Sequence, residues 1–348
     1  EMDSFQKIFN ELFDDSIFKA TSHKIYTNDS FELTLHHCKL INNNNNECKG
    51  IILLQHPLWF SSLHFILKGK ESIVYKLLIN GYDVWLGNNR GNEFTKQYNN
   101  NKIYNWSFQD MGYLDLTQII KYINNNACNN QNNNGIIYIG ISQGSMQFIS
   151  LMSTYIEYQK YIKHSIWITP PISFELNTFV LYYFVKILSL LPNWFVVFFT
   201  SIGGIIGKIL PFSILWFFTK LSAKLMGFLR LSDTMKYDEL SKLRLKHLPS
   251  GFMTKTMCEH FNTLSDKKSI IFDRNNNKIF NISNIKIPIS IIIGEHDCCC
   301  NVVKTIGYAH NKLKSYLKNL IIIPKMSHLD VIWSDVLPNM VVNLCQKI

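Results

Sequence analysis

Short continuous apolar runs recur along the chain, and each is followed by a segment with helical spacing. The runs occupy residues 50–54, 82–86, 136–139, 165–168, 289–293 and 320–323. Apolar runs of this length without alternation are typical of strands buried on both faces of a sheet. Helices are expected at 64–79, 107–123, 143–158, 302–318 and 335–346. This alternation predicts an α/β fold with a mostly parallel sheet and helices on both faces.

The first forty residues have a different pattern. Apolar residues at helical spacing predict one amphipathic helix over 3–19. Alternating residues over 23–38, centred on Asn28–Ser30, predict a hairpin. Asparagine-rich runs at 42–46 and 124–134 predict solvated loops that interrupt no strand.

The segment from 173 to 250 differs from the rest of the chain. It has no acidic residue between Leu176 and Leu231, and residues 187–207 carry no charge. It lies between the predicted strand at 165–168 and the next one at 289–293. We therefore predict an inserted helical cap at 173–250, flanked by two parts of an α/β core at 1–172 and 251–348.

The apolar cap raises the question of a membrane. Residues 187–207 are long enough to cross a bilayer, but Pro192–Asn193 and three glycines interrupt them, so we expect a cap and not a span. The surplus of apolar side chains in the cap, and the exclusively basic charges between Glu175 and Asp233, predict docking on a membrane or lipid-droplet surface. The alternative is that these residues pack on the core and line an acyl tunnel.

Composition and charge exclude other classes of protein. The chain has 348 residues, of which 47% are hydrophobic and 17% charged, so it has a large core and is not disordered. Its net charge is +10, but the basic residues are scattered, and nucleic-acid binding is not expected. The chain begins at Glu1 without a signal-peptide pattern, and the sequence does not indicate a compartment.

The eight cysteines form no CxxC pair and no spacing typical of disulfides. Neither a metal site nor a cofactor is expected. The run Cys298–Cys300 is interpreted as small buried side chains in a tight turn. Acylation of a surface cysteine is the alternative.

Residues 140–144 form a GxSxG sequence that ends one predicted strand and begins a helix. A sharp turn in this setting places the serine at the carboxyl edge of the sheet, and glycines are needed where strand and helix approach closely. Ser142 is therefore the candidate nucleophile.

A serine nucleophile needs a base and an acid, and in this fold they follow it in the order acid, then histidine. Asp297 and His328 each follow a predicted strand, so both are expected at the same sheet edge as Ser142. Glu295 and Asp330 are alternative acids. Glu295 lies close to the strand end, and Asp330 adjoins His328 in a poor geometry. His296 neighbours the acid and is expected to point elsewhere.

Acyl transfer also needs N–H donors for the oxyanion. The backbone N–H of Gln143 is one candidate. The second is that of Leu58, because Pro57 has no N–H. His56 precedes the nucleophile in the chain and is interpreted as a structural residue of the loop.

Several motifs resemble the acid lipases, the family of lysosomal and gastric lipases and steryl ester hydrolases. The most specific is GYDVWLGNNRGN at 81–92, and the others are LQH at 54–56, FQDM at 108–111, PSG at 249–251 and SHLDVIW at 327–333. The resemblance implies an α/β-hydrolase fold and hydrolysis of triacylglycerols or cholesteryl esters by Ser142, Asp297 and His328. The chain departs from the family pattern at three places. Pro57 lies where the family usually has glycine, and the other two departures are Cys298–Asn301 and the cap.

Three functions are weighed. The first is a lipase or steryl ester hydrolase acting on neutral lipid esters. The second keeps the same triad but transfers the acyl group to another acceptor, or takes smaller esters or thioesters. The third is an inactive membrane-binding relative, which has no physical need for an intact triad.

Overall fold

The computed structural model describes residues 2–41, 48–98, 104–127, 135–267 and 269–348. Its main sheet has the order β1-β2-β4-β3-β6-β7-β10-β11. The strands are β1 (Phe18–Tyr26), β2 (Phe31–Leu40), β3 (Ile51–Gln55), β4 (Asp83–Gly87), β6 (Ile136–Ile141), β7 (Ile162–Ile168), β10 (Ile289–Gly294) and β11 (Leu317–Ile323). All neighbours from β4 to β11 are parallel, whereas β2 pairs antiparallel with β1, with β4 and with short β5 (Thr95–Gln97).

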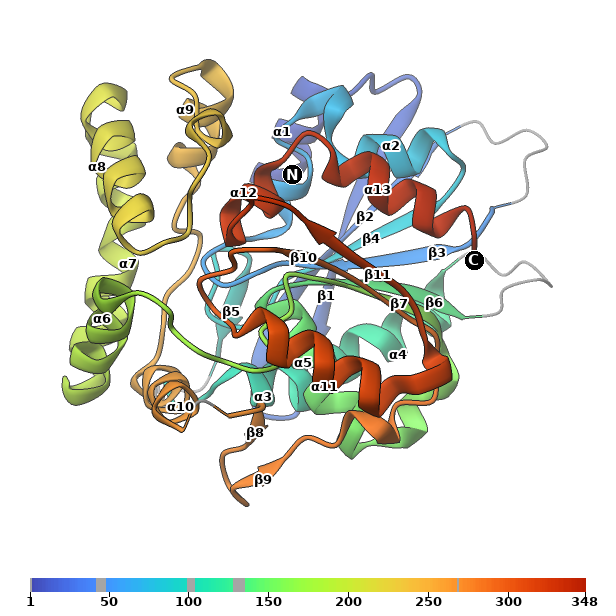
Figure 1. Cartoon of the computed structure of the whole chain (residues 1–348). Coiled ribbons are helices and arrows are strands. Elements are labelled where there is room, and N and C mark those ends of the chain that lie inside the picture. The colour runs from blue at the N-terminus through green and yellow to red at the C-terminus, as the bar shows by residue number, and fades with distance from the viewer. Residues whose placement is uncertain (1, 42–47, 99–103, 128–134, 268) are drawn as a thin grey trace.

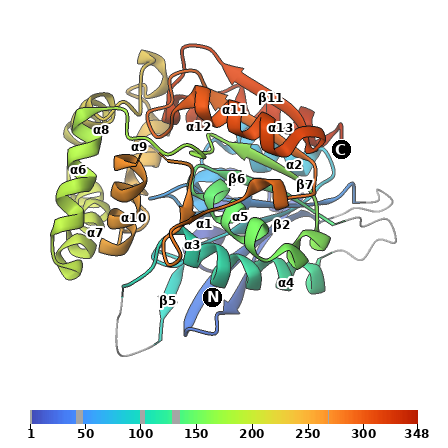
Figure 2. The ribbon, with the colours of Figure 1, turned by 60° about the horizontal axis from the view of Figure 1, so that its bottom comes forward.

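Helices cover both faces of this sheet, as Figures 1 and 2 show. One face carries α1 (Ser4–Leu12), α2 (Ile73–Ile79) and α13 (Leu337–Cys345), whose apolar side chains form one core cluster with the strands. The other face carries α4 (Thr117–Asn126), α5 (Gln143–Thr154) and α11 (Val302–Leu313), which contribute to a second cluster. The predicted fold class is confirmed.

Several predicted helices are shorter or more divided than expected. The first ends at Leu12, because Phe13 is already extended and β1 begins at Phe18. The segment 64–79 is not one helix. It contains two 3₁₀ turns, Ser62–Phe65 and Gly69–Glu71, before α2. The break has local causes: Gly69 has a φ of 53°, and the Ser72 hydroxyl accepts a hydrogen bond from the Tyr75 N–H and starts a new helix.

Other helix boundaries also differ from the predicted ones. The helix predicted at 107–123 is α3 (Phe108–Asp110), a π-helical turn at 111–116 and then α4, which runs to Asn126 into the predicted loop. The rest of that loop at 128–134 and the run at 42–46 lie outside the described residues. The helix predicted at 143–158 ends at Thr154, and the one at 302–318 ends at Leu313, where 3₁₀ turns follow. The hairpin at 23–38 is confirmed by β1 and β2.

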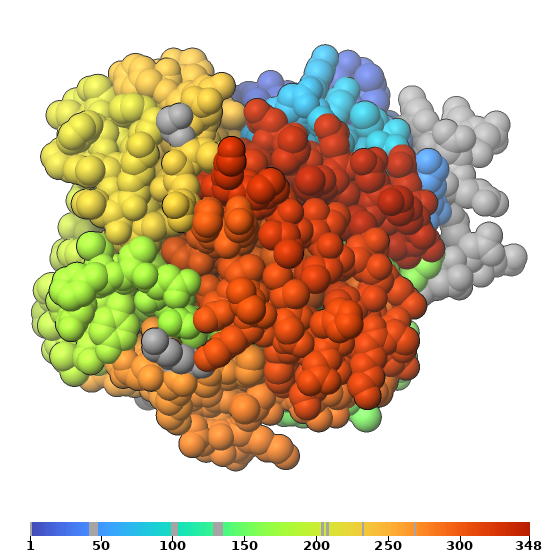
Figure 3. All heavy atoms as spheres, viewed as in Figure 1, coloured from blue at the N-terminus to red at the C-terminus, as the bar shows by residue number. Residues whose placement is uncertain are grey.

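The segment predicted as a cap forms a layer of helices beside the carboxyl edge of the sheet. It contains α6 (Phe179–Leu190), α7 (Asn193–Ile209), α8 (Phe212–Leu225) and α9 (Glu239–Lys246). These green to yellow helices lie at one end of the molecule in Figures 1 and 2, and Figure 3 shows their side chains against the orange and red core. The following α10 (Lys255–Asp266) packs against α6, since Tyr182 donates a hydrogen bond to Asp266.

The apolar stretch at 187–207 is divided between α6 and α7. The break falls at Leu191–Pro192, and Pro211 separates α7 from α8. Among the helices of the described ranges, none has both the length and the apolar character that crossing a bilayer requires.

Candidate active site

Ser142 occupies the turn between β6 and α5 with a φ of 52° and a ψ of −112°. The turn is tight enough to require both glycines. A Cβ added to Gly140 would lie 2.8 Å from the Ser145 nitrogen, and one added to Gly144 would lie 2.6 Å from the Gln55 carbonyl oxygen. The GxSxG pattern therefore reflects two backbone approaches, and together they hold the serine in a conformation that L-residues rarely adopt.

The three residues predicted as a triad come together at this turn. The Ser142 Oγ lies 2.8 Å from His328 Nε2, and His328 Nδ1 lies 2.7 Å from Asp297 Oδ2. The other carboxylate oxygen of Asp297 accepts the Cys299 backbone N–H at 2.8 Å. Asp297 and His328 are buried, and Ser142 is 9% exposed. The arrangement can move a proton from serine to histidine while the aspartate orients the imidazole.

The alternative acids have other partners. Glu295 accepts the Lys325 N–H at 2.8 Å. Asp330 accepts the N–H groups of Ser327 and Arg230 at 3.0 and 2.8 Å, so it joins the histidine loop to the cap. Both ring nitrogens of His328 are already used by Asp297 and Ser142. His296 lies beside Glu295, at 3.7 Å, and faces away from the triad.

The predicted oxyanion donors lie beside Ser142. Leu58 and Gln143 line the same cavity as Ser142 and His328. Gln143 is the first residue of α5, so its N–H has no acceptor within the helix and the local helix dipole favours negative charge. Their roles as donors stay predictions that this geometry allows.

His56 holds the loop that carries Leu58. Its Nδ1 lies 2.8 Å from the Pro57 carbonyl oxygen, and its Nε2 accepts the Asn89 N–H at 3.1 Å. Burial lowers the pKa of His56 to about 4, so the ring is neutral near pH 7 and its Nδ1 donates. Histidine here is a hydrogen-bond bridge between two loops, as the sequence analysis proposed.

The GNNRGN residues hold the turn after β4. Arg90 donates from Nε and Nη2 to Asp115 at 2.9 and 2.6 Å, and from Nη1 to Asp29 at 2.6 Å. The Asn88 side chain accepts the Ser62 N–H at 3.0 Å and donates to the Thr34 carbonyl at 2.9 Å. Only the family resemblance singles out this motif in the sequence. Its polar side chains fasten the turn after β4 to β2, to Asp115 and to the 3₁₀ turn that begins at Ser62.

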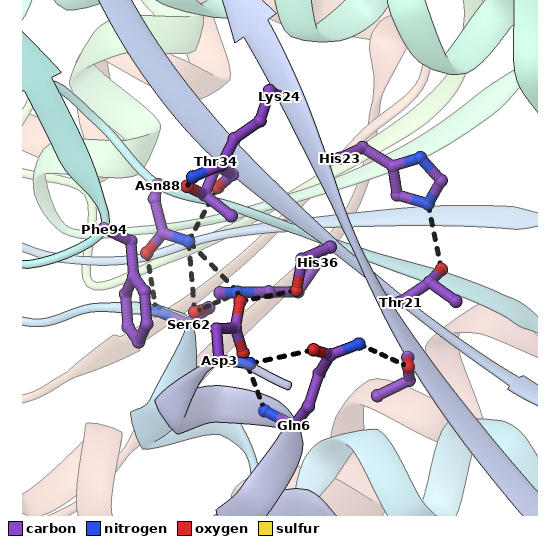
Figure 4. Close-up of polar contacts among 12 residues, drawn as sticks. Asp3, Gln6, Thr21, His23, Lys24, Thr34, His36, Ser62, Asn88 and Phe94 are labelled. Carbon is purple, nitrogen blue, oxygen red and sulfur yellow. Dashed lines mark hydrogen bonds and ion pairs between the residues drawn. The ribbon is translucent and has the colours of Figure 1, made fainter. Parts of the chain in front are cut away.

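A second Ser–His–Asp set lies in this region, as Figure 4 shows. The Ser62 Oγ is 2.7 Å from His36 Nδ1, and His36 Nε2 is 3.4 Å from Asp3 Oδ2. Ser62 and His36 have no exposed surface, and burial lowers the pKa of His36. No substrate can reach this serine, so the set fastens α1 to β2 and to the loop after Leu58.

Ser142 opens into an apolar cavity of about 410 Å³, a volume in the range of small-molecule sites. The core and the cap both line it, through residues that include Phe174, Leu181, Phe199, Leu215, Met226 and Phe228. Ser142, Gln143 and His328 are among its few polar residues. A long apolar group fits this lining better than a charged one.

The run Cys298–Cys300 is buried, as predicted, so no surface thiol is present there for acylation. Ligand atoms of Asp297, Cys299 and His328 lie within 4.8 Å of one another, a spacing that could also hold a metal ion. However, the contact with Cys298 and burial raise the pKa of the Cys299 thiol, which keeps it protonated. Both nitrogens of His328 are occupied as well, so the geometry favours a triad.

The fold is that of an α/β hydrolase, and Ser142, the candidate nucleophile, lies at the turn between strand and helix. No family model matches the chain. The chain is 24% identical over 371 residues to the lysosomal acid lipase/cholesteryl ester hydrolase of Macaca fascicularis, an alignment covering 95% of this chain and 88% of the relative. It is 30% identical to triacylglycerol lipase 1 of Arabidopsis thaliana, over 40% of this chain and 36% of that relative.

Among solved structures, the bromoperoxidase of Bacillus anthracis is similar in fold, with a TM-score of 0.55, 16% identity, and coverage of 94% of this chain and all of that one. The resemblance to the acid lipases is confirmed, since the curated relatives are named lipases. The comparisons support a carboxylic ester hydrolase. Some of these alignments cover only about a third of the relative's length.

The acid of the triad can be tested by two isosteric changes. Asp297→Asn is expected to lower kcat by up to about ten-thousandfold, because the amide no longer fixes the imidazole tautomer. Glu295→Gln, in the same loop, is the matched control and is expected to retain near-normal turnover. Steady-state kinetics on a soluble ester measures both. A silent Asp297→Asn together with a crippling Glu295→Gln would show that the acid is Glu295.

Proposed function

We propose that this protein is a lipase that hydrolyses carboxylic esters of neutral lipids, triacylglycerols or steryl esters, through an acyl-enzyme on Ser142. The observation that carries the proposal is the hydrogen-bonded chain Ser142–His328–Asp297 at the base of a large apolar cavity. A reactive serine in such a cavity suits an ester with a long hydrocarbon chain. The names of the relatives, one a triacylglycerol lipase and one a cholesteryl ester hydrolase, support this substrate class.

The reaction follows from the geometry of the three side chains. His328 Nε2 takes the Ser142 proton as the hydroxyl oxygen attacks the ester carbonyl. The N–H groups of Leu58 and Gln143 stabilise the oxyanion. The proton then passes from His328 to the departing alcohol, which leaves the acyl group on Ser142. Water, activated by the same imidazole, releases the fatty acid and restores the serine.

The cap is proposed to dock on the surface of a membrane or lipid droplet. It exposes many large apolar side chains, among them Phe179, Leu190, Trp194, Phe198, Ile209 and Phe218, with exposed fractions of 57–76%. Contiguous exposed apolar surface is costly in water and typical of an interaction site. Between Glu175 and Asp233 the charges of the cap are all basic, which favours an anionic lipid surface.

An ester panel tests the substrate class. The protein is expected to cleave cholesteryl oleate or trioleoylglycerol with higher kcat/KM than a short p-nitrophenyl ester, because only a long chain fills the apolar cavity. Fatty-acid release measures the first two substrates and absorbance the third. Cleavage restricted to short esters, or acyl transfer to an added alcohol in place of hydrolysis, would favour the esterase or acyltransferase alternative.

The docking face can be tested without touching the cavity. Leu190, Trp194 and Phe198 lie together at the α6–α7 turn and the first turns of α7. Changing all three to serine is expected to weaken sedimentation with phosphatidylglycerol vesicles about a hundredfold, from roughly 1 kcal/mol of lost apolar burial per side chain.

The matched control changes exposed apolar residues of the core, Ile79, Val303 and Ile322, to serine and is expected to leave vesicle binding unchanged. Both triple variants should keep parental activity on a soluble short ester. Equal vesicle binding by the cap variant and the parent would show that these exposed cap residues do not dock on lipid.

A further inference from the structure

A second, smaller cavity of about 50 Å³ lies between the cap and the core, and it contains an arginine without an acceptor. Arg244 comes from α9 of the cap and is 7% exposed. Within the described residues its guanidinium donates no hydrogen bond and joins no ion pair. It lies over the ring of Trp333, with 5.2 Å from Cζ to the ring centroid.

An unpaired buried charge is expensive, and other cations of this structure avoid that cost. Lys68 lines the same cavity but donates to the carbonyl oxygens of Trp333 and Ser334 at 3.0 Å and to Asp335 at 2.7 Å. All three of its donors are therefore used. Burial lowers the pKa of Arg244 to about 10, although Asp238 and Asp335 act to raise it. Arg244 thus stays charged at neutral pH with five N–H donors unused.

This cavity shares a wall with the cavity of Ser142. The residues that line both are Pro57, Phe60, Ile332 and Trp333. The rest of the lining combines apolar residues, namely Phe65, Ile73, Ile141, Leu337 and Pro338, with the polar residues His56, His64, Lys68, Ser72 and Ser334. A charged donor group in an apolar wall next to the acyl site suits a ligand with an anionic head and a hydrocarbon tail.

We propose that Arg244 binds the carboxylate head of a long-chain fatty acid in this cavity, while the hydrocarbon tail lies in the adjoining cavity of Ser142. The inference rests on the proposed function, because ester hydrolysis at Ser142 is what supplies such a carboxylate. A guanidinium matches a carboxylate through two parallel hydrogen bonds. The uncleaved ester has no anion, so the site distinguishes product from substrate and draws the released acid away from the serine.

The size and lining of the cavity favour a carboxylate over a phosphate group. A water molecule needs about 10–15 Å³ on this measure of volume, so 50 Å³ holds a group of a few heavy atoms. A phosphate dianion calls for more than one available cation, and Lys68 is already saturated. Inorganic phosphate is therefore a competing ligand that the experiment must include.

Binding is tested in the full chain carrying Ser142→Ala, so that no turnover is needed. Calorimetry measures the binding of three ligands: oleate below its micellar concentration, oleyl alcohol and inorganic phosphate. Oleyl alcohol has the same hydrocarbon chain as oleate but no charge. Arg244→Gln is expected to weaken oleate binding at least about tenfold, from the loss of a charge-assisted pair, and to leave oleyl alcohol binding unchanged. Arg244→Lys keeps the positive charge but loses the two parallel N–H donors, so its affinity for oleate should lie between those of the parent and Arg244→Gln.

Lys242→Gln is the matched control, because Lys242 lies on the same helix with an exposed side chain. It should bind oleate like the parent. Thermal unfolding provides a second readout: oleate should raise the Tm of the parent and of Lys242→Gln but not of Arg244→Gln. Without ligand, Arg244→Gln should unfold no earlier than the parent, since it removes an unpaired buried charge.

The proposal would be overturned if Arg244→Gln bound oleate as tightly as the parent does. It would also be overturned if the parent bound phosphate in preference to oleate. The two proposals fail separately. If the wild-type protein cleaves no ester while oleate binding depends on Arg244, the proposed function fails and the carboxylate site stands. If esters are cleaved but Arg244 has no effect on oleate, only the carboxylate site fails.

Discussion

The structure around the site depends on one close approach, between the turn at Ser142 and the end of β3. Gln55 pairs with Gly140 across the sheet, and its carbonyl oxygen leaves no room for a side chain on Gly144. That contact places the start of α5 against the loop carrying Leu58, so both predicted oxyanion donors come from elements in direct contact. The neighbouring parallel strands then bring the loops after β10 and β11, with Asp297 and His328, to the same edge.

The cap is fastened to these catalytic loops at two places. At its start, the Glu175 and Asn177 N–H groups donate to the carbonyl oxygens of Cys299 and Cys298. After α8, the Leu329 N–H donates to the Phe228 carbonyl oxygen at 2.9 Å, and Asp330 accepts the Arg230 N–H. The loops of the acid and the base are therefore also the anchors of the cap.

Much of the fold and of the candidate site could be predicted from the sequence, because the signals for the strands and for the triad residues are local. Buried parallel strands appear as continuous apolar runs, and the triad residues each directly follow such a run. The division of 64–79 was missed because Gly69 and Ser72 break a segment whose apolar spacing resembles one helix. The roles of Asp330 and Arg244 were not accessible at all. Each role depends on which hydrogen-bonding groups the fold brings close from distant parts of the chain. For Asp330 these groups come from residues 230–234, about a hundred residues away. Local sequence patterns do not indicate such contacts.

The central claim is that Ser142 is the nucleophile, although the chain also holds Ser62 within hydrogen-bonding distance of a histidine. Labelling with a fluorophosphonate, followed by peptide mass spectrometry, tests this most directly. The account predicts one adduct, on the peptide containing Ser142, that is lost in Ser142→Ala and retained in Ser62→Ala. An adduct that persists in Ser142→Ala, or that maps to Ser62, would contradict it.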